Sequence, residues 1–189
     1  NYTPINFETK WYETWEKNGY FNADNSSDKP AFSMILPPPN ITGILHIGHT
    51  MNMAIQDSIT RFKRMSGYNT LWLPGTDHAG IATQNKVERM LHDMGTSKEE
   101  IGKDKFIDKT WEWKNKYGNI ITKQFRKVGS SFDWSREKFT MDEKVSEAVK
   151  EAFVKLYNDD LIYQGEYIVN WCPKDKTALA DDEINHEDT

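Results

Sequence analysis

Two short apolar runs, each stopped by proline and followed by a helical pattern, most strongly constrain how this chain can fold. The first run covers residues 31–36 and ends at three consecutive prolines, residues 37–39. The second covers residues 70–73 and ends at Pro74-Gly75. Proline has no N–H to donate to a ladder, so it ends a buried strand. The order strand, helix, strand, helix predicts a parallel sheet with right-handed crossovers.

The helices are predicted from apolar residues that recur at helical spacing. One helix follows the first strand and ends at Gly67, another spans residues 81–94, and a third spans residues 105–128. Their apolar or aromatic positions are Ile47, Met51, Ile55, Ile59 and Phe62; Val87, Leu91 and Met94; and Phe106, Trp113, Tyr117 and Phe125.

The two ends of the chain have weaker patterns. Asn6 is predicted to cap a first helix that Gly19 ends, and residues 22–30 form a polar loop. Residues 140–143 are predicted to form a capping box for a later helix, and residues 163–171 a strand before the acidic tail 180–189. The apolar positions are Phe7, Trp11 and Trp15 in the first helix, and Val145, Val149, Ala152, Phe153 and Leu156 in the later one.

Composition narrows the class of protein. The chain has 189 residues, of which 13% are aromatic, so it should fold. Its 24 Lys and Arg against 29 Asp and Glu give a net charge of −5, which argues against a dedicated nucleic-acid module. No apolar run has the roughly 18 residues of a membrane span. The lone Cys172 excludes an internal disulfide and favours a reducing cytoplasm. The first residue, Asn1, and the small sheet together predict a trimmed piece of a larger protein.

The turn from the first strand into the next helix contains the most informative chemistry, because open α/β sheets bind ligands at such turns. A helix N-terminus favours phosphate. His46 and His49 are three residues apart, so they share a face and could donate hydrogen bonds to phosphate oxygens. Gly43 and Gly48 would let a flat base or ribose approach. Two alternatives are a metal pair completed by the segment Asp77-His78, and ordinary surface histidines.

Residues 75–80 form a second strand-to-helix turn, which a parallel sheet would place beside the first. Asp77 would then face the ligand cleft, where a carboxylate suits a substrate ammonium group. The alternative is that Asp77 caps the helix starting near Ala79.

Several segments resemble a known family. The tetrapeptide His46-Ile47-Gly48-His49 matches the HIGH motif of class I aminoacyl-tRNA synthetases. The segment before it, residues 37–43, and the segment Gly-Thr-Asp-His-Ala-Gly-Ile-Ala-Thr-Gln at 75–84 are similar to the valyl-tRNA synthetase branch in particular. Residues 132–137, Phe-Asp-Trp-Ser-Arg-Glu, and 170–173, Asn-Trp-Cys-Pro, also resemble that branch, so the resemblance covers nearly the whole chain.

This resemblance implies an α/β fold, namely the first half of a Rossmann-like parallel-sheet catalytic domain with an N-terminal helix and a helical insertion. It implies activation of L-valine by ATP with Mg²⁺ to give valyl-adenylate, followed by attachment to valine tRNA. His46 and His49 would be catalytic, Gly43 and Gly48 would help them bind ATP, and Pro38, Asn40 and Asp77 would bind valine. The implied HIGH region comprises Pro39, Asn40, Ile41, Thr42, Gly43, Ile44, Leu45, His46, Ile47, Gly48 and His49.

The resemblance also implies a division of the chain and several missing parts. Residues 1–30 would be an N-terminal helix and loop, 31–100 the half-domain with the HIGH motif, 101–160 its helical part, and 161–189 a strand and connection toward an editing insert. The KMSKS motif, the editing domain and the anticodon-binding helices are absent, so we expect the chain to be inactive alone. Residues 63–66 resemble KMSKS superficially but are predicted to be a solvated helix end. Lys174 and Asp175 stand where some relatives have zinc-binding cysteines, so no zinc is predicted.

Two rival hypotheses stay open. One is a smaller nucleotidylyl transferase that uses the same histidine turn on another acid. The other is a non-catalytic synthetase-derived module that binds RNA or a protein. RNA contacts could come from Lys123, Arg126 and Lys127, although an exposed charged helix face is favoured for these residues.

Overall fold

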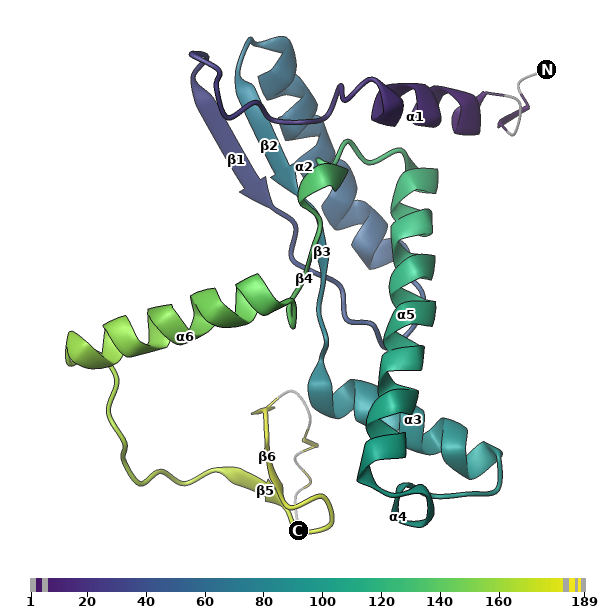
Figure 1. Ribbon diagram of the computed structural model, residues 1–189, viewed down its shortest axis with the longest axis vertical. Helices are drawn as coiled ribbons and strands as arrows, with labels where there is room; N and C mark the ends of the chain where they lie inside the picture. The colour runs from purple at the N-terminus through teal and green to yellow at the C-terminus, as the bar shows by residue number, and fades with distance from the viewer. Residues whose placement is uncertain (1–2, 5–6, 182–183, 186, 188–189) are drawn as a thin grey trace. The chain divides into compact units, whose positions relative to one another are not determined.

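The computed structural model describes residues 3–4, 7–181, 184–185 and 187 (Figure 1). The chain separates into two compact units, Asn1–Glu147 and Ala148–Thr189, and their boundary falls inside helix α6 (Glu143–Asn158). No helix among the described residues is both long and apolar enough to cross a membrane.

A parallel strand pair joined by one helix forms the centre of the first unit. Strand β1 (Ala31–Ile35) pairs with β2 (Asn69–Leu73) over five residues in parallel register, and helix α2 (Ile47–Met65) connects them (Figure 1). The predicted strands and helix are confirmed to within a residue or two. Each strand ends before proline, as the missing N–H requires.

A second parallel pair continues from the first. Strand β3 (Gly75–Thr76) follows β2 directly and pairs with β4 (Lys138–Phe139). The close approach of the two backbones depends on Gly75, because a Cβ atom at this position would lie 2.8 Å from the carbonyl oxygen of Lys138.

The Gly75→Ala variant is therefore expected to lose about 1–3 kcal/mol of stability, because the backbone of β4 must move to admit the methyl group. Equilibrium urea unfolding of the chain measures this loss. Gly118→Ala is the matched control, since a Cβ at Gly118 meets nothing within 4 Å and lies in a helix, where alanine is favoured. Equal stability of Gly75→Ala and wild type would contradict the expectation.

The remaining helices of this unit surround the long helix α5 (Lys103–Val128), which confirms the predicted helix over 105–128. Helices α1, α3 and α4 all contact α5, and a short 3-10 helix follows it. Their bounds are Glu8–Lys17 for α1, Gly80–Asp93 for α3, Lys98–Ile101 for α4 and Trp134–Arg136 for the 3-10 helix. The hydrophobic core comprises Leu36, Ile41, Met53, Trp72, Ile121, Phe125, Phe132 and Phe139.

Helix α2 buries a different face from the one its apolar stripe predicts. Met53 and Thr60 are buried, whereas Ile47 is 82% exposed and Phe62 63% exposed. The inner face is held partly by polar contacts: Trp72 donates its indole N–H to Gln56 at 3.0 Å. The stripe that comprises Ile47, Met51, Ile55, Ile59 and Phe62 therefore lies on the exposed side of α2.

Helix α1 departs from its predicted face in the same way. Trp11 is half exposed, whereas Tyr12 is buried and donates its hydroxyl to the carbonyl of Ser130 at 2.6 Å. Trp134 donates its indole N–H to the same hydroxyl at 2.7 Å, and burial raises the pKa of Tyr12 to about 12. The predicted cap, Asn6, lies outside the described residues. In helix α3, Val87 and Leu91 are buried as expected, but Met94 is exposed.

A buried carboxylate ties the polar loop after α1 to the segment after α5. Asp133 is fully buried and accepts hydrogen bonds from the backbone N–H groups of Ala23 and Ser135, from the Ser135 hydroxyl and from the Arg136 guanidinium. Arg136 also donates to the carbonyl of Ala23 at 3.0 Å and to the side chain of Asn25 at 2.9 Å.

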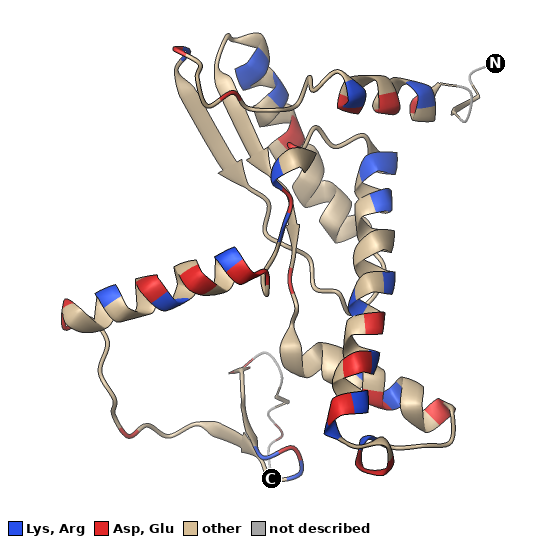
Figure 2. Ribbon diagram, in the orientation of Figure 1, with Lys and Arg blue, Asp and Glu red and all other residues tan. Residues whose placement is uncertain are grey.

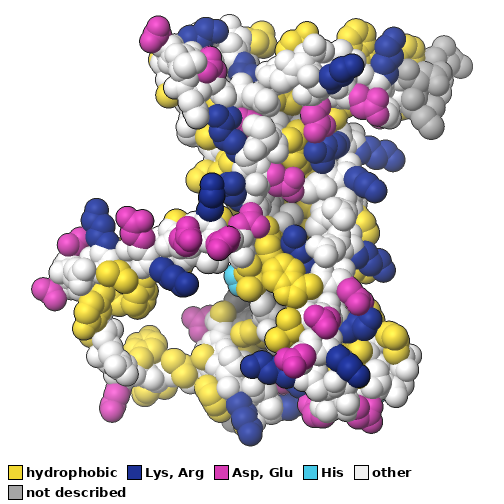
Figure 3. Space-filling model, viewed as in Figure 1, with side chains coloured by type: hydrophobic (Ala, Val, Ile, Leu, Met, Phe, Trp, Pro, Cys, Tyr) yellow, Lys and Arg dark blue, Asp and Glu magenta, His cyan; other side chains and the backbone are white. Residues whose placement is uncertain are grey.

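The second unit has little strand. Strands β5 (Asn170–Cys172) and β6 (Thr177–Leu179) form an antiparallel hairpin, so the prediction of a strand over 163–171 is wrong except at its end. The residues before β5 make no ladder and are exposed; Ile168 is 94% exposed. Figure 3 shows hydrophobic side chains standing out from this segment between α6 and β5.

Candidate active site

The two predicted turns lie side by side in the structure. Asp77 donates its backbone N–H to the carbonyl of Pro39 at 2.8 Å, and Ile41 donates its N–H to the carbonyl of Asp77 at 3.0 Å. These two bonds form a parallel bridge between Asn40 and Asp77. The turn that leads into α2 and the turn that leads into α3 therefore meet at the carboxyl ends of the strands, where open α/β sheets bind ligands.

Helix α5 holds the first turn from behind. Trp113 donates its indole N–H to the carbonyl of Ile41 at 2.7 Å, and the side-chain oxygen of Gln124 accepts from the backbone N–H of Leu45 at 2.9 Å. These supports were missed in the sequence, because contacts some 70 residues apart leave no local pattern. Two side chains of α5 thus fix the backbone of the turn that contains the two histidines.

The two histidines form the N-terminal cap of α2. The Nδ1 atom of His46 accepts from the backbone N–H of Gly48, and the Nδ1 atom of His49 accepts from the backbone N–H of His46, both at 3.2 Å. Their ring centroids are 4.0 Å apart. An Nδ1 atom that accepts has no proton, so in a neutral ring the proton is on Nε2. In this arrangement the Nε2 atom of each ring is the one left to act as a donor.

The surroundings of His49 favour this neutral form. Burial lowers the pKa of His49, and the neighbouring His46 lowers it further. Gly48 leaves room for the pair, because a Cβ at this position would lie 3.1 Å from two atoms of the His46 ring. A Cβ at Gly43 meets nothing within 4 Å, so the space over Gly43 is open among the described residues.

The Asp77 carboxylate is 35% exposed and is held through one of its oxygens. Its Oδ1 atom accepts from the backbone N–H of Ala79 at 3.2 Å and from the hydroxyl of Thr140 at 3.0 Å. The alternative that Asp77 is the N-cap of the following helix is not confirmed, because the N-cap of α3 is Ala79 and no side-chain capping hydrogen bond is made there. The predicted capping box at residues 140–143 is wrong: α6 begins at Glu143, and Thr140 instead contacts Asp77.

The other predicted substrate residues lie on the same turn. Pro38 and Asn40 are exposed, while Pro39 and Ile41 between and after them are buried. Among the described residues, no group of three His, Cys, Asp or Glu side chains is placed to hold a metal ion.

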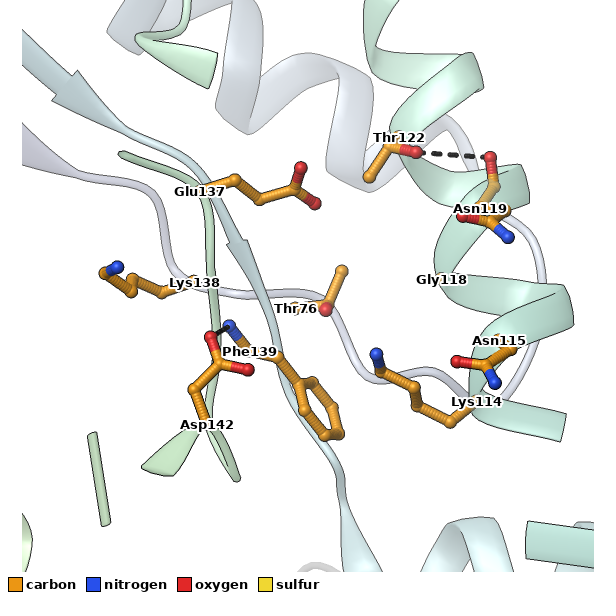
Figure 4. Close-up of a pocket in the computed structure, with 10 residues that line it drawn as sticks. All are labelled: Thr76, Lys114, Asn115, Gly118, Asn119, Thr122, Glu137, Lys138, Phe139 and Asp142. Atoms are coloured by element: carbon orange, nitrogen blue, oxygen red, sulfur yellow. Dashed lines mark hydrogen bonds between the residues drawn. The ribbon is translucent and has the colours of Figure 1, made fainter. Parts of the chain in front are cut away.

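A separate hollow of about 290 Å³ lies between α5 and β4 (Figure 4). Thr76 and Phe139 line it from the strands, Lys114 and Asn119 line it from α5, and the histidine pair does not contribute to it. The candidate site is therefore an open edge of the sheet and not this hollow.

Two basic residues that the sequence suggested for other roles, Arg64 in a KMSKS-like segment and Arg126 in RNA contacts, have partners within the fold. Figure 2 shows positive charges in the last turns of α2 and α5, where cations complement the helix dipole. Arg64 donates to the carbonyl of Ser131 at 2.8 Å, so it has a structural partner. Arg126 bonds Glu16 through two nitrogen atoms and lies over the Trp134 ring, so it too has structural partners.

Comparison with known proteins agrees with this arrangement. A family model described as tRNA synthetases class I (I, L, M and V) matches residues 10–189. The chain therefore belongs to the class I tRNA synthetases. Within that class it is similar to valine–tRNA ligases: it is 61% identical to that of Fusobacterium nucleatum over its whole length, 54% identical to that of Geobacter sulfurreducens over 99%, and 53% identical to that of Thermotoga maritima over 99%.

The chain spans about a fifth of the length of these relatives, 21–22%. A solved structure has a similar fold: the LeuRS chain of a ternary LeuRS–tRNA–LeuAMS complex from Agrobacterium radiobacter K84. It matches with a TM-score of 0.77 and 24% identity, and the match covers 98% of this chain and 22% of that one. The fold class is thus confirmed as the α/β type of class I synthetases, with short parallel sheets.

Proposed function

We propose that this chain is an N-terminal part of a valine–tRNA ligase, whose full-length protein converts L-valine and ATP to valyl-adenylate and pyrophosphate and then transfers valine to its tRNA with release of AMP. The observation that supports this most is the backbone bridge between Asn40 and Asp77. It places the turn into α2, a helix N-terminus of the kind that binds phosphate, beside the turn that contains the Asp77 carboxylate. The similarity to valine–tRNA ligases supports the choice of amino acid. The lone Cys172 supports a cytoplasmic location.

In the proposed reaction, a carboxylate oxygen of valine attacks the α-phosphorus of ATP, and pyrophosphate leaves with its Mg²⁺. The valine carboxylate is already an anion, so no general base is needed, and catalysis depends on alignment and charge stabilisation. His46 and His49 would donate Nε2–H to phosphate oxygens as negative charge shifts toward the leaving group. The positive end of α2 adds to this stabilisation.

Recognition of valine would take place at the second turn. Asp77 would accept hydrogen bonds from the substrate ammonium group, and a charge-assisted pair of this kind orients the amino acid. Pro38 and Asn40 would line the side-chain pocket, and Gly43 and Gly48 would leave space for the nucleotide. A valine pocket of this kind rejects threonine only about a hundredfold, since the two side chains are nearly isosteric.

The test is amino-acid-dependent ATP–pyrophosphate exchange by the full-length protein. We expect valine to support exchange, threonine to support it with kcat/KM lower by about a hundredfold, and isoleucine to be similarly poor. The chain by itself serves as a second sample, and we expect little exchange from it. Exchange with a different carboxylic acid and none with valine would favour a smaller nucleotidylyl transferase. No exchange with any acid would overturn the proposal.

A further inference from the structure

Thr140 lies beside Asp77 although 63 residues separate them in sequence. Its position follows from the second strand pair, because its backbone N–H donates to the carbonyl of Thr76 at 3.2 Å and so extends the ladder between β3 and β4. The side chain of Thr140 therefore sits at the carboxyl end of β4, at the same edge of the sheet as the two turns.

The hydroxyl of Thr140 makes three polar contacts. It lies 2.9 Å from the backbone nitrogen of His78, 2.6 Å from Nδ1 of His78 and 3.0 Å from Oδ1 of Asp77. A hydroxyl has one proton to donate, and an ionised carboxylate only accepts. Only one arrangement satisfies all three contacts. The backbone N–H and the Nδ1–H of His78 both donate to the hydroxyl, and the hydroxyl donates to Oδ1 of Asp77.

This arrangement makes the two carboxylate oxygen atoms of Asp77 differ in their hydrogen bonds. In the described part of the chain, Oδ1 receives both hydrogen bonds, from Thr140 and from the N–H of Ala79, and Nδ1 of His78 lies 3.3 Å from the same atom. Oδ2 receives none of them. The carboxylate is thus fixed in rotation by one oxygen while the other is left to accept from a ligand.

We propose that Thr140 is a positioning residue for amino-acid binding: it orients the Asp77 carboxylate so that Oδ2 meets the substrate ammonium group, and His78 in turn orients Thr140. This inference rests on the proposed function of the full-length protein. Thr140 acts through Asp77: in the part of the chain that the structure describes, its side-chain hydrogen bonds join it to Asp77 and His78 and not to His46 or His49.

The experiment compares Thr140→Val and Thr140→Ser in the full-length protein by valine-dependent ATP–pyrophosphate exchange. Valine replaces threonine with nearly the same volume but removes the hydroxyl. Losing a hydrogen bond to a charged group should raise KM for valine by roughly 10- to 100-fold in Thr140→Val. KM for ATP and kcat should change by less than about threefold, because uniform binding energy is lost only on the amino-acid side. Thr140→Ser keeps the hydroxyl and should restore KM for valine to near the wild-type value.

Thr110→Val is the matched control. The Thr110 hydroxyl donates to the carbonyl of Phe106 within α5 at 2.9 Å and not to Asp77, so the same substitution there should leave both KM values unchanged. Unchanged KM for valine in Thr140→Val, or equal losses in Thr140→Ser and Thr140→Val, would overturn the role of the hydroxyl. A parallel rise of both KM values, or a similar loss in Thr110→Val, would also overturn it. Wild-type protein that shows no valine-dependent exchange would instead refute the proposed function.

Discussion

Replacing His46 by alanine is expected to lower kcat for valine-dependent exchange in the full-length protein by about 10²–10³-fold, with little change in KM for valine. Removal of a single donor aimed at developing charge has effects of this size in other enzymes. The expectation follows from the cap geometry: Nδ1 of His46 accepts from Gly48, so its Nε2–H is the group free to donate to phosphate. Steady-state exchange kinetics at saturating ATP measure the effect.

The control for this variant is His92→Ala. His92 is exposed in the last turn of α3, so the same substitution there removes an imidazole without touching the histidine turn. A second variant, His46→Asn, removes the imidazole but retains a side chain able to cap the helix, so it separates the loss of the ring from the loss of the cap. If His46→Ala kept the wild-type kcat, or if its loss equalled that of His92→Ala, the catalytic role of His46 would be refuted.

The largest expected loss of stability is that of Asp133→Ala. Asp133 is fully buried and accepts four hydrogen bonds, one of them from the Arg136 guanidinium. The alanine variant removes all four hydrogen bonds and the charge partner of Arg136, and it leaves the N–H of Ala23 without its acceptor, so we expect a loss of about 3–5 kcal/mol. Equilibrium urea unfolding of the chain, followed by tryptophan fluorescence, measures it.

Asp24→Ala is a suitable comparison for Asp133→Ala. The Asp24 carboxylate is exposed and bonds its own neighbour Ser26 at 2.7 Å to the hydroxyl and 2.9 Å to the N–H. We expect a much smaller loss there, because water can replace these contacts. Similar midpoints for the two variants would show that the buried network around Asp133 contributes no special stability.

The strands and the main helices were predictable because their signals are local. Proline ended β1 and β2 where the sequence indicated, and the aromatic spacing located α5. The small capped helix α4 was missed although its signal is also local: Ser97 and Glu100 form a capping box. The proline stops, the aromatic spacing and the capping box each involve residues close together in the chain, so they can be recognised in one sequence.

The buried faces were harder to predict than the elements. Helix α2 packs through Met53, Thr60 and hydrogen-bonded polar side chains, whereas its apolar stripe lies outside. Hydrophobic spacing alone cannot separate a face that meets the core of this unit from one that is exposed here. Helix α1 shows the same limit, since the buried residue is Tyr12, whose hydroxyl is satisfied by partners more than 100 residues away.

The meeting of the two turns was predictable from the sequence, but the residues that support the turns were not. Asp77 and the two histidines lie in turns that glycine and proline make recognisable, and the meeting of these turns at one sheet edge follows from the strand order. Trp113, Gln124 and Thr140 reach those turns from distant segments, and a single sequence has no signal for such contacts. A local pattern even suggested a different role for Thr140, because Thr and Glu three residues apart also match a capping box.

The use of both Nδ1 atoms as acceptors in the cap of α2 bears on how the proposed enzyme would release pyrophosphate. A neutral imidazole donates a hydrogen bond to a phosphate oxygen without adding a full positive charge. It therefore stabilises the charge on that oxygen, and it attracts the departing pyrophosphate less than an imidazolium would. Product release limits turnover in many enzymes. By using Nδ1 of both rings to cap α2, the fold leaves the two Nε2 atoms as the donors that the proposed reaction would use.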